Sequence, residues 1–309
     1  MQQFTISVIG LGEVGTIISA LLISDFNRIN LNLIDIKTDI SGRILDLEHA
    51  ASVQNINVTV NNQKKLIQSD FIVFTAGFSN PKGKDRNTVV IHNKKIVELI
   101  FEGVKLKNNA TIIVITNPVE IISQLISKTL NHKYLVIGTG TALDTFRFKY
   151  LLSEKFQVDI TKVKALVLGE HGEYMIPIFS KCFVNNQSIM DLLTPKECHQ
   201  LTTELKNTAT TIRMTEQATK YGVSQIVMTI IKALNTNNSS VKIPISIMIN
   251  DYYKKYLRTN DDIFISLPCE ISKNKVNILA IDDLNVTELN GFSQAANALM
   301  TTYKSLKKV

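Results

Sequence analysis

The first 150 residues alternate short, almost wholly apolar runs with longer amphipathic stretches. The apolar runs predict strands, and the amphipathic stretches predict helices that begin near Glu13, Ser41, Asn87, Pro118 and Thr141. The predicted strands are Phe4 to Gly10, Leu31 to Asp35, Phe71 to Thr75, Thr111 to Thr116 and Tyr134 to Ile137. Strands that are apolar throughout are typical of a parallel sheet with helices on both faces. At the fourth helix, Asn117 followed by Pro118 predicts an N-cap and then a proline at the first helical position.

From about residue 160 the pattern changes. Two long helical patterns, Lys196 to Leu234 and Leu284 to Lys307, lie between and after strand-like runs, which predicts an α+β arrangement. The strand-like runs are Val163 to Leu168, Ile176 to Val184, Val241 to Ile249 and Ile263 to Cys269. No stretch rich in proline and serine separates the two halves. We therefore expect two packed domains, at residues 1–142 and 143–309.

The composition is that of a globular protein: 309 residues, 45% hydrophobic and 20% charged. These proportions exclude a disordered or fibrous chain. No apolar run approaches the roughly 18 residues that cross a membrane, and a strand-like run follows Met1 without a signal peptide, so we expect a cytoplasmic protein. The cysteines, Cys182, Cys198 and Cys269, lie far apart, so neither a disulfide framework nor a metal site is expected.

The formal net charge of +7 raises the possibility of a nucleic-acid partner. Such a partner requires a clustered basic face or a recognisable module. The lysines are instead spread along the chain, apart from Lys304, Lys307 and Lys308 at its end, so no nucleic-acid partner is expected. Of the 34 basic residues only six are arginine, and two of these, Arg86 and Arg147, lie in the polar segments described below.

A glycine-rich run directly joins the first predicted strand to the first predicted helix. In this run Gly10 permits a tight turn, Gly12 lets the backbone approach a pyrophosphate, and Gly15 allows close packing of helix and strand. The second strand ends about twenty residues later at Asp35, whose carboxylate can accept from both hydroxyls of an adenosine ribose and would repel a phosphate there. The sequence therefore predicts a Rossmann dinucleotide-binding domain with a doubly wound parallel sheet that takes NAD rather than NADP.

Three other segments place polar residues beside buried strands or on a helix. A loop from Thr75 to Arg86 follows the third predicted strand, at the sheet edge where ligands bind and lids are built. Asp144 and Arg147 are three residues apart and so share a helix face, and His171 lies between two glycines just past a strand. Each feature has an ordinary alternative: a solvated charge in the loop, a surface ion pair on the helix, and a turn residue between the glycines.

Together these motifs resemble the NAD-dependent L-lactate/malate dehydrogenase family over essentially the whole chain, most closely its L-lactate and L-2-hydroxyisocaproate dehydrogenase branch. The matching motifs are Gly10 to Gly15, Asp35, Asp46 to Ala50, Thr75 to Gly77, the loop ending at Arg86, Thr116 to Val119, Gly138 to Thr145 and Gly169 to Gly172. The resemblance implies that NAD contacts Gly10, Gly12, Glu13, Val14, Gly15, Asp35, Thr75, Ala76, Gly77 and Asn117.

The same resemblance implies a role for each polar residue of the predicted active site. His171 would be the acid/base, since its unperturbed pKa of about 6.5 lies near working pH. Asp144 would hold the other ring nitrogen, and Arg147 would bind the substrate carboxylate through a two-point fork that lysine cannot reproduce. Arg86 would close over the substrate and polarise its carbonyl. Asn117 would orient the substrate, and Thr219 would form part of the pocket wall.

The family discriminates between substrates six residues before the loop arginine, and here that position is Asn80. Asparagine has no charge to pair with a second carboxylate, which disfavours oxaloacetate and malate. We therefore expect an L-lactate dehydrogenase, or an enzyme for a longer aliphatic 2-oxo acid. Malate remains an alternative if Lys82 or Lys84 turns inward, and an NAD-binding regulatory protein is the non-enzymatic alternative. The resemblance also implies a homodimer or homotetramer.

Overall fold

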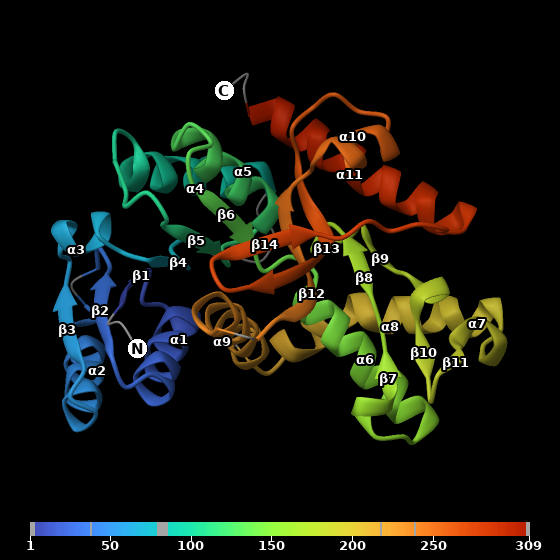
Figure 1. The fold of residues 1–309 in the computed structure, drawn as a ribbon, viewed down its shortest axis with the longest axis horizontal. Helices are drawn as coiled ribbons and strands as arrows, with labels where there is room; N and C mark the ends of the chain where they lie inside the picture. Colours follow the sequence, from blue (N-terminus) through green and yellow to red (C-terminus); the bar gives the residue numbers. More distant parts are fainter. Residues whose placement is uncertain (1–3, 38, 79–85, 217, 238, 307–309) are drawn as a thin grey trace. The chain divides into compact units, whose positions relative to one another are not determined.

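The computed structural model describes residues 4–37, 39–78, 86–216, 218–237 and 239–306 (Figure 1). The chain divides into two compact units. The first combines residues 1–138 with 220–235, and the second combines residues 139–219 with 236–309. Within the described ranges, no helix is both long and apolar enough to cross a membrane.

The first unit contains a six-stranded parallel sheet in the order β3-β2-β1-β4-β5-β6. Its strands are β1 (Phe4–Ile9), β2 (Ile29–Ile34), β3 (Asn57–Val60), β4 (Phe71–Phe74), β5 (Thr111–Val114) and β6 (Leu135–Gly138). The central strands are buried throughout, as the apolar runs predicted. Because the strand order reverses between β1 and β4, the carboxyl ends of these two strands border the crevice where such sheets bind ligands. The fold is the Rossmann arrangement that the sequence predicted.

Six helices of this unit are described: α1 (Glu13–Asp25), α2 (Ser41–Val53), α3 (Gln63–Ile67), α4 (Arg86–Phe101), α5 (Val119–Thr129) and α9 (Tyr221–Asn235). The helix α9 packs along α1, although some 200 residues separate them in the chain. The sequence predicted one long helix from Lys196 to Leu234. This prediction is wrong, because α8 (Pro195–Arg213) ends well before α9 begins, and the two helices belong to different units.

Two smaller predictions also need correction in the first unit. Pro118 is the N-cap of α5 and not its first helical residue, because its backbone is extended, with ψ at 117°. The strand β3 was missed. It lies at the sheet edge, where its side chains are only partly buried, so Asn57–Val60 lacks the apolar run that marked the other strands.

The second unit is built on antiparallel pairs. The long strands β12 (Val241–Met248) and β13 (Phe264–Ser272) pair with each other, and β13 also pairs with β14 (Lys275–Ile278) and β8 (Val167–Gly169). The strand β9 (Met175–Pro177) pairs with β8, while β7 (Val163–Lys164), β10 (Phe183–Val184) and β11 (Gln187–Ser188) form a separate small sheet. The helices of this unit are α6 (Ala142–Phe156), α7 (Ile189–Leu192), α8, α10 (Asp251–Tyr256) and α11 (Val286–Leu306). This is the α+β domain that the sequence predicted.

Two predicted strands of this unit are each divided. The run Val163 to Leu168 forms β7 and β8, which belong to different sheets, and the run Ile176 to Val184 forms β9, a short 3-10 helix (Phe179–Lys181) and β10. The runs were predicted as single strands because most of their side chains are apolar and at least half-buried on both sides of each break. Phe148 and Leu152 of α6 pack against Val163 and Val167, which fixes α6 against β8.

Candidate active site

A short contact joins His171 to Asp144 in the second unit. The Nδ1 atom of His171 lies 2.6 Å from Oδ2 of Asp144. Asp144 lies in the first turn of α6, and His171 follows β8, so the contact links a helix to the end of a strand. Such a contact holds one ring nitrogen as the donor and so selects the tautomer of the imidazole.

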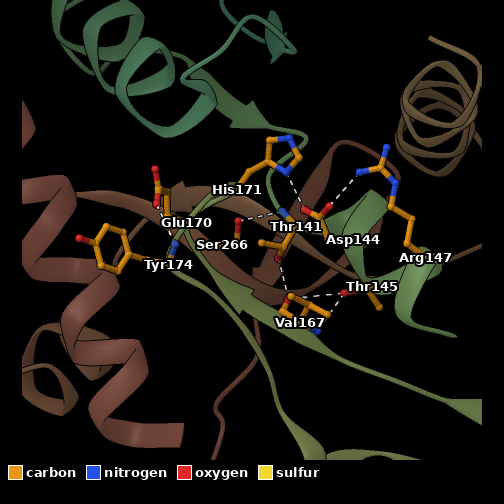
Figure 2. Close-up of polar contacts among 9 residues, drawn as sticks. All are labelled: Thr141, Asp144, Thr145, Arg147, Val167, Glu170, His171, Tyr174 and Ser266. Atoms are coloured by element: carbon orange, nitrogen blue, oxygen red, sulfur yellow. Dashed lines mark hydrogen bonds and ion pairs between the residues drawn. The ribbon is translucent and has the colours of Figure 1, made fainter. Parts of the chain in front are cut away.

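The other carboxylate oxygen of Asp144 accepts a hydrogen bond from Arg147, at 3.1 Å from Nη1. The side chain of Asp144 is 1% exposed, that of Arg147 11% and that of His171 25%. Burial is the largest influence on the pKa of Asp144 and raises it, but the charges and hydrogen bonds of His171 and Arg147 together lower that pKa below its ordinary value. Asp144 is therefore a buried anion between two side chains that point in different directions (Figure 2).

Two threonines of the α6 region fix the helix to β8 through a single residue. The Oγ1 of Thr141 donates to the carbonyl of Val167 at 2.6 Å, and the amide of Val167 donates to Oγ1 of Thr145 at 3.0 Å. These bonds are buried, and they hold the start of α6 beside the strand that leads to His171 (Figure 2). The geometry of the Asp144–His171 contact thus depends on packing beneath it.

The chain leaves β8 through Gly169, whose φ is +94°. A Cβ atom there would lie 2.5 Å from Cδ1 of Ile176 and 2.6 Å from the carbonyl oxygen of Tyr174, so only glycine fits. After this turn the amide of Tyr174 donates to the Glu170 carboxylate at 3.1 Å, which closes the loop that carries His171. Gly169 and Gly172, the glycines on either side of His171, therefore belong to a loop whose shape is fixed by the turn at Gly169 and by this hydrogen bond.

The glycine-rich run of the first unit lies between β1 and α1, as the sequence predicted. Gly10 has φ at +94°, and a Cβ atom there would lie 2.5 Å from the backbone of Ala76. A Cβ atom on Gly12 would meet nothing within 4 Å, which leaves room for a group to approach the backbone. Val14 and Gly15 lie in the first turn of α1, whose amides form an anion site. These features fit the pyrophosphate of a dinucleotide.

Asp35 follows β2 and lies against the same loop. Its Oδ2 accepts from the amide of Leu11 at 2.7 Å, and its Oδ1 accepts from the amide of Lys37 at 2.9 Å. The carboxylate is thus fixed at the end of β2, next to the turn that would hold the pyrophosphate. This placement suits a carboxylate that accepts hydrogen bonds from ribose hydroxyls.

Thr75, Ala76 and Gly77 follow β4 and pack against the neighbouring loops. The hydroxyl of Thr75 donates to the carbonyl of Gly10 at 2.6 Å, and that of Thr116 donates to the carbonyl of Ala76 at 2.8 Å. The ends of β1, β4 and β5 are thereby tied together. The cofactor-binding residues predicted after these strands consequently lie at one edge of the sheet.

A residue that the sequence analysis missed links two of the predicted segments. Asn93 of α4 is fully buried; its Oδ1 accepts from the amide of Phe78 at 2.7 Å, and its Nδ2 donates to the carbonyl of Asn117 at 3.0 Å. The signal was an asparagine within the apolar stripe of a helix, which also carries Val90 and Val97. Buried polar side chains are kept where they satisfy backbone groups.

The structure describes the remaining predicted residues only in part, or not at all. Arg86 is the first residue of α4, and its side chain lies outside the described part of the structure. Asn80, Lys82 and Lys84 lie outside the described residues. Thr219 is half-buried and lies just before α9. The structure thus brings His171, Asp144 and Arg147 together in one unit, and it groups the predicted cofactor residues in the other. In the described part of the chain, no group of three or more histidine, cysteine or acidic side chains could hold a metal ion.

Two features are typical of the NAD-dependent dehydrogenases that act on small hydroxy acids. One is the parallel sheet with a glycine-rich turn, and the other is a histidine fixed by a buried carboxylate that also binds an arginine. Family models confirm and narrow this class. The NAD binding domain of lactate/malate dehydrogenase matches residues 4–138, and the alpha/beta C-terminal domain matches residues 141–309. The chain belongs to the lactate/malate dehydrogenase family, and it is an NAD-dependent oxidoreductase.

Relatives and solved structures agree with this family. An L-lactate dehydrogenase of Clostridium botulinum (strain 657 / Type Ba4) is 29% identical over 308 residues, which cover 96% of this chain and 95% of the relative. L-lactate dehydrogenase 1 of Clostridium acetobutylicum is 29% identical, with 97% and 98% covered. The minor L-lactate dehydrogenase of Enterococcus mundtii matches with a TM-score of 0.85 and 26% identity, covering 98% of each chain. The malate dehydrogenase of Cryptosporidium parvum, 24% identical, shares the fold with a TM-score of 0.86 over 100% of both chains.

Proposed function

We propose that this protein reduces a small 2-oxo acid to the L-2-hydroxy acid and catalyses the reverse reaction, with pyruvate and L-lactate as first choice and a longer aliphatic 2-oxo acid as second. The observation that carries the proposal is the cluster of His171, Asp144 and Arg147, with its contacts of 2.6 and 3.1 Å. NADH, when bound, supplies the hydride. The side chains of the cluster supply the proton and hold the substrate.

His171 would donate a proton to the substrate oxygen during reduction and accept it during oxidation. Because Nδ1 faces Asp144, the proton is exchanged at Nε2, on the other side of the ring (Figure 2). The buried Asp144 carboxylate favours the charged imidazolium, since an opposite charge at 2.6 Å in a weakly solvated site is strongly stabilising. Reduction requires the protonated histidine and oxidation requires the neutral one.

Arg147 would bind the substrate carboxylate. Only Nη1 is used by Asp144, and a guanidinium has five N–H donors, so a second edge can form a fork with a carboxylate. With 11% of its side chain exposed, Arg147 is held in place before the substrate arrives. One anion, Asp144, thus positions both the proton donor and the carboxylate-binding group.

Residues of the other segments complete the proposed site. We assign the cofactor to the loop Gly10 to Gly15 with Asp35, Thr75, Ala76, Gly77 and Asn117. Arg86 would polarise the reacting carbonyl, Asn117 would orient the substrate, and Thr219 would form a pocket wall. These roles follow from the family resemblance and remain predictions.

The choice of pyruvate rests on Asn80 and on the relatives, several of which are named L-lactate dehydrogenase. Asn80 supplies no positive charge for a second carboxylate. Malate and oxaloacetate are the alternative to both of these substrate classes, because Lys82 or Lys84 could provide that charge and because solved malate dehydrogenases share the fold. A cytoplasmic homodimer or homotetramer is the state we expect, and light scattering of the purified protein will determine its mass.

A panel of 2-oxo acids with NADH tests the proposal. We expect the highest kcat/KM for pyruvate or for 2-oxoisocaproate, and a much lower value for oxaloacetate. Asn80→Arg is the matched variant, because it adds the missing charge and should move the preference toward oxaloacetate. A clear preference of the unaltered enzyme for oxaloacetate would sink the assignment in favour of malate.

A further inference from the structure

Glu13 places a carboxylate in the loop that would hold the cofactor's pyrophosphate. It is the first residue of α1, and 41% of its side chain is exposed. The amino end of a helix attracts anions, so the carboxylate is favoured there while no other anion is present. The same negative charge opposes a pyrophosphate that approaches the backbone of Gly12.

Two cations flank this carboxylate. The Nζ of Lys220 lies 3.1 Å from Oε2 of Glu13, and Nη2 of Arg43 lies 3.9 Å from Oε1. Arg43 also donates a hydrogen bond to the carbonyl of Leu11 in the same loop. With the Asp35 carboxylate, which accepts from the amide of Leu11, the loop is bordered by two negative and two positive side chains, so the loss of any one of them changes the balance of charge.

Lys220 reaches the loop because α9 lies parallel to α1. Lys220 pairs with Glu13 at the start of the two helices, and Lys232 pairs with Asp25 at their ends, where Nζ and Oδ2 are 2.6 Å apart. In both pairs the residues are 207 positions apart, so the helices advance in the same direction. Their amino ends point the same way, and both add positive potential on that side.

The side chain of Lys220 is confined. It is only 15% exposed, and its Nζ lies 5.4 Å from the centre of the Tyr221 ring. A weakly solvated ammonium requires a nearby anion, because the loss of hydration is otherwise uncompensated. Exchanging the Glu13 carboxylate for a pyrophosphate beside Lys220 therefore costs less free energy than ordering and dehydrating an exposed lysine at the same place. Beside Gly12 there is space for the incoming group, as described above.

We propose that Lys220 binds the pyrophosphate of NAD, and that Glu13 neutralises Lys220 until the pyrophosphate takes its place. The two residues then set cofactor affinity in opposite directions. Lys220 strengthens binding through a charge-assisted contact, and Glu13 weakens it through competition for the same ammonium. The inference rests on NAD binding, which belongs to the family, and does not depend on which 2-oxo acid is the substrate.

Binding measurements without turnover test this inference. We expect Lys220→Met, which keeps an unbranched side chain only one heavy atom shorter, to raise the Kd for NADH and for ADP-ribose by about fivefold or more. Binding of adenosine, which lacks the pyrophosphate, should not change. Glu13→Gln should lower the Kd for NADH by about threefold and make this Kd more dependent on added salt, because the site becomes more positive, whereas Lys220→Met should make it less dependent on salt.

Lys232→Met is the matched control, because it removes the ion pair at the far end of the same two helices. We expect it to leave the Kd for ADP-ribose within about twofold of the unaltered protein. Equal losses in the two lysine variants would mean that both act through helix packing, which overturns the proposal. Unchanged or weaker NADH binding in Glu13→Gln would overturn the competition between carboxylate and pyrophosphate.

Discussion

The amide nitrogen of Asn93 donates a hydrogen bond of 3.0 Å to the carbonyl of Asn117. The oxygen of the same amide accepts from the backbone of Phe78, at the start of the loop that leads to Arg86. One buried side chain therefore connects Phe78, where the loop to Arg86 begins, to the residue proposed to orient the substrate. It does so without contact to solvent, since Asn93 is fully buried.

Replacing Asn93 should affect both stability and substrate binding. Asn93→Ala leaves the carbonyl of Asn117 and the amide of Phe78 without this partner in partly buried surroundings, so we expect the free energy of unfolding to fall by about 1–3 kcal/mol. The KM for the 2-oxo acid should rise more than kcat falls, because the segments that hold substrate lose their common support. Urea denaturation and initial rates measure these effects. A variant within about 0.5 kcal/mol of the unaltered protein would contradict this account.

Asp144→Asn should impair chemistry while leaving NADH binding unchanged. The amide preserves the shape of the carboxylate but removes the charge that stabilises imidazolium, and it can present a donor to Nδ1. We expect kcat/KM for the 2-oxo acid to fall by about 10²–10⁴-fold, as in other histidines that lose an orienting carboxylate. Steady-state rates and NADH fluorescence titration check the two parts. A loss smaller than about tenfold would show that His171 does not need this partner.

Asp144 should also contribute to the pH dependence of stability. Its pKa is lower in the folded protein than the ordinary value of 3.8, so the folded state gains stability from the ionised group above that value. This contribution is lost as pH falls through the lower folded-state pKa. The difference in unfolding free energy between the unaltered protein and Asp144→Asn should therefore be largest near neutral pH, about 3 kcal/mol, and shrink below pH 4. Urea titrations at several pH values measure it, and a constant difference would argue against the shift.

Arg147→Lys keeps the charge but removes the planar fork. We expect kcat/KM for the 2-oxo acid to fall by about 100-fold, mainly through KM, because a point charge cannot form two parallel bonds to the carboxylate. Arg213→Lys on α8 is the matched control, since Arg213 is exposed and its Nε bonds only within its own helix, at 3.2 Å. Similar kinetics for both variants would remove Arg147 from the binding site.

The cysteines should differ sharply in reactivity. Burial raises the pKa of Cys182 and of Cys269 to about 12, while Cys198 on α8 is only partly buried and its pKa is raised less, again mainly by burial. A thiol reagent at pH 8 should therefore modify Cys198 slowly and spare the other two until urea is added. Mass spectrometry counts the modified thiols. In Cys198→Ser the folded protein should not react, and rapid modification of Cys269 would refute the burial argument.

The central fold could be predicted because its physical signal is local. Strands such as Phe71–Phe74 are buried on both faces, so each is a continuous apolar run, and Gly10 is required by a turn. The edge strand Asn57–Val60 lacked that signal, because edge positions tolerate polar side chains. The division of Lys196 to Leu234 into two helices could not be predicted either. The helical pattern of the sequence continues between α8 and α9, and the helices separate because each packs in a different unit.

In the candidate site, too, residues with a local sequence signal could be predicted, and residues whose partners lie far along the chain could not. Asp144 and Arg147 share a helix face by spacing alone, and the family motifs supplied His171. The roles inferred for Asn93 and Lys220 depend on partners far along the chain, in the case of Lys220 207 residues away. No pattern within a window of sequence can reveal such a partner.

The return of α9 to the first unit has a consequence for how this protein can be cut. The nucleotide-binding unit is not one uninterrupted stretch of gene: a fragment that stops after β6 would carry α1 without the helix that packs along it, and Glu13 and Asp25 without their lysines. Truncation after β6 therefore removes α9, a helix that belongs to the nucleotide-binding unit. A transplantable version of this half needs α9 supplied in the same polypeptide, joined by a linker that lets it run parallel to α1.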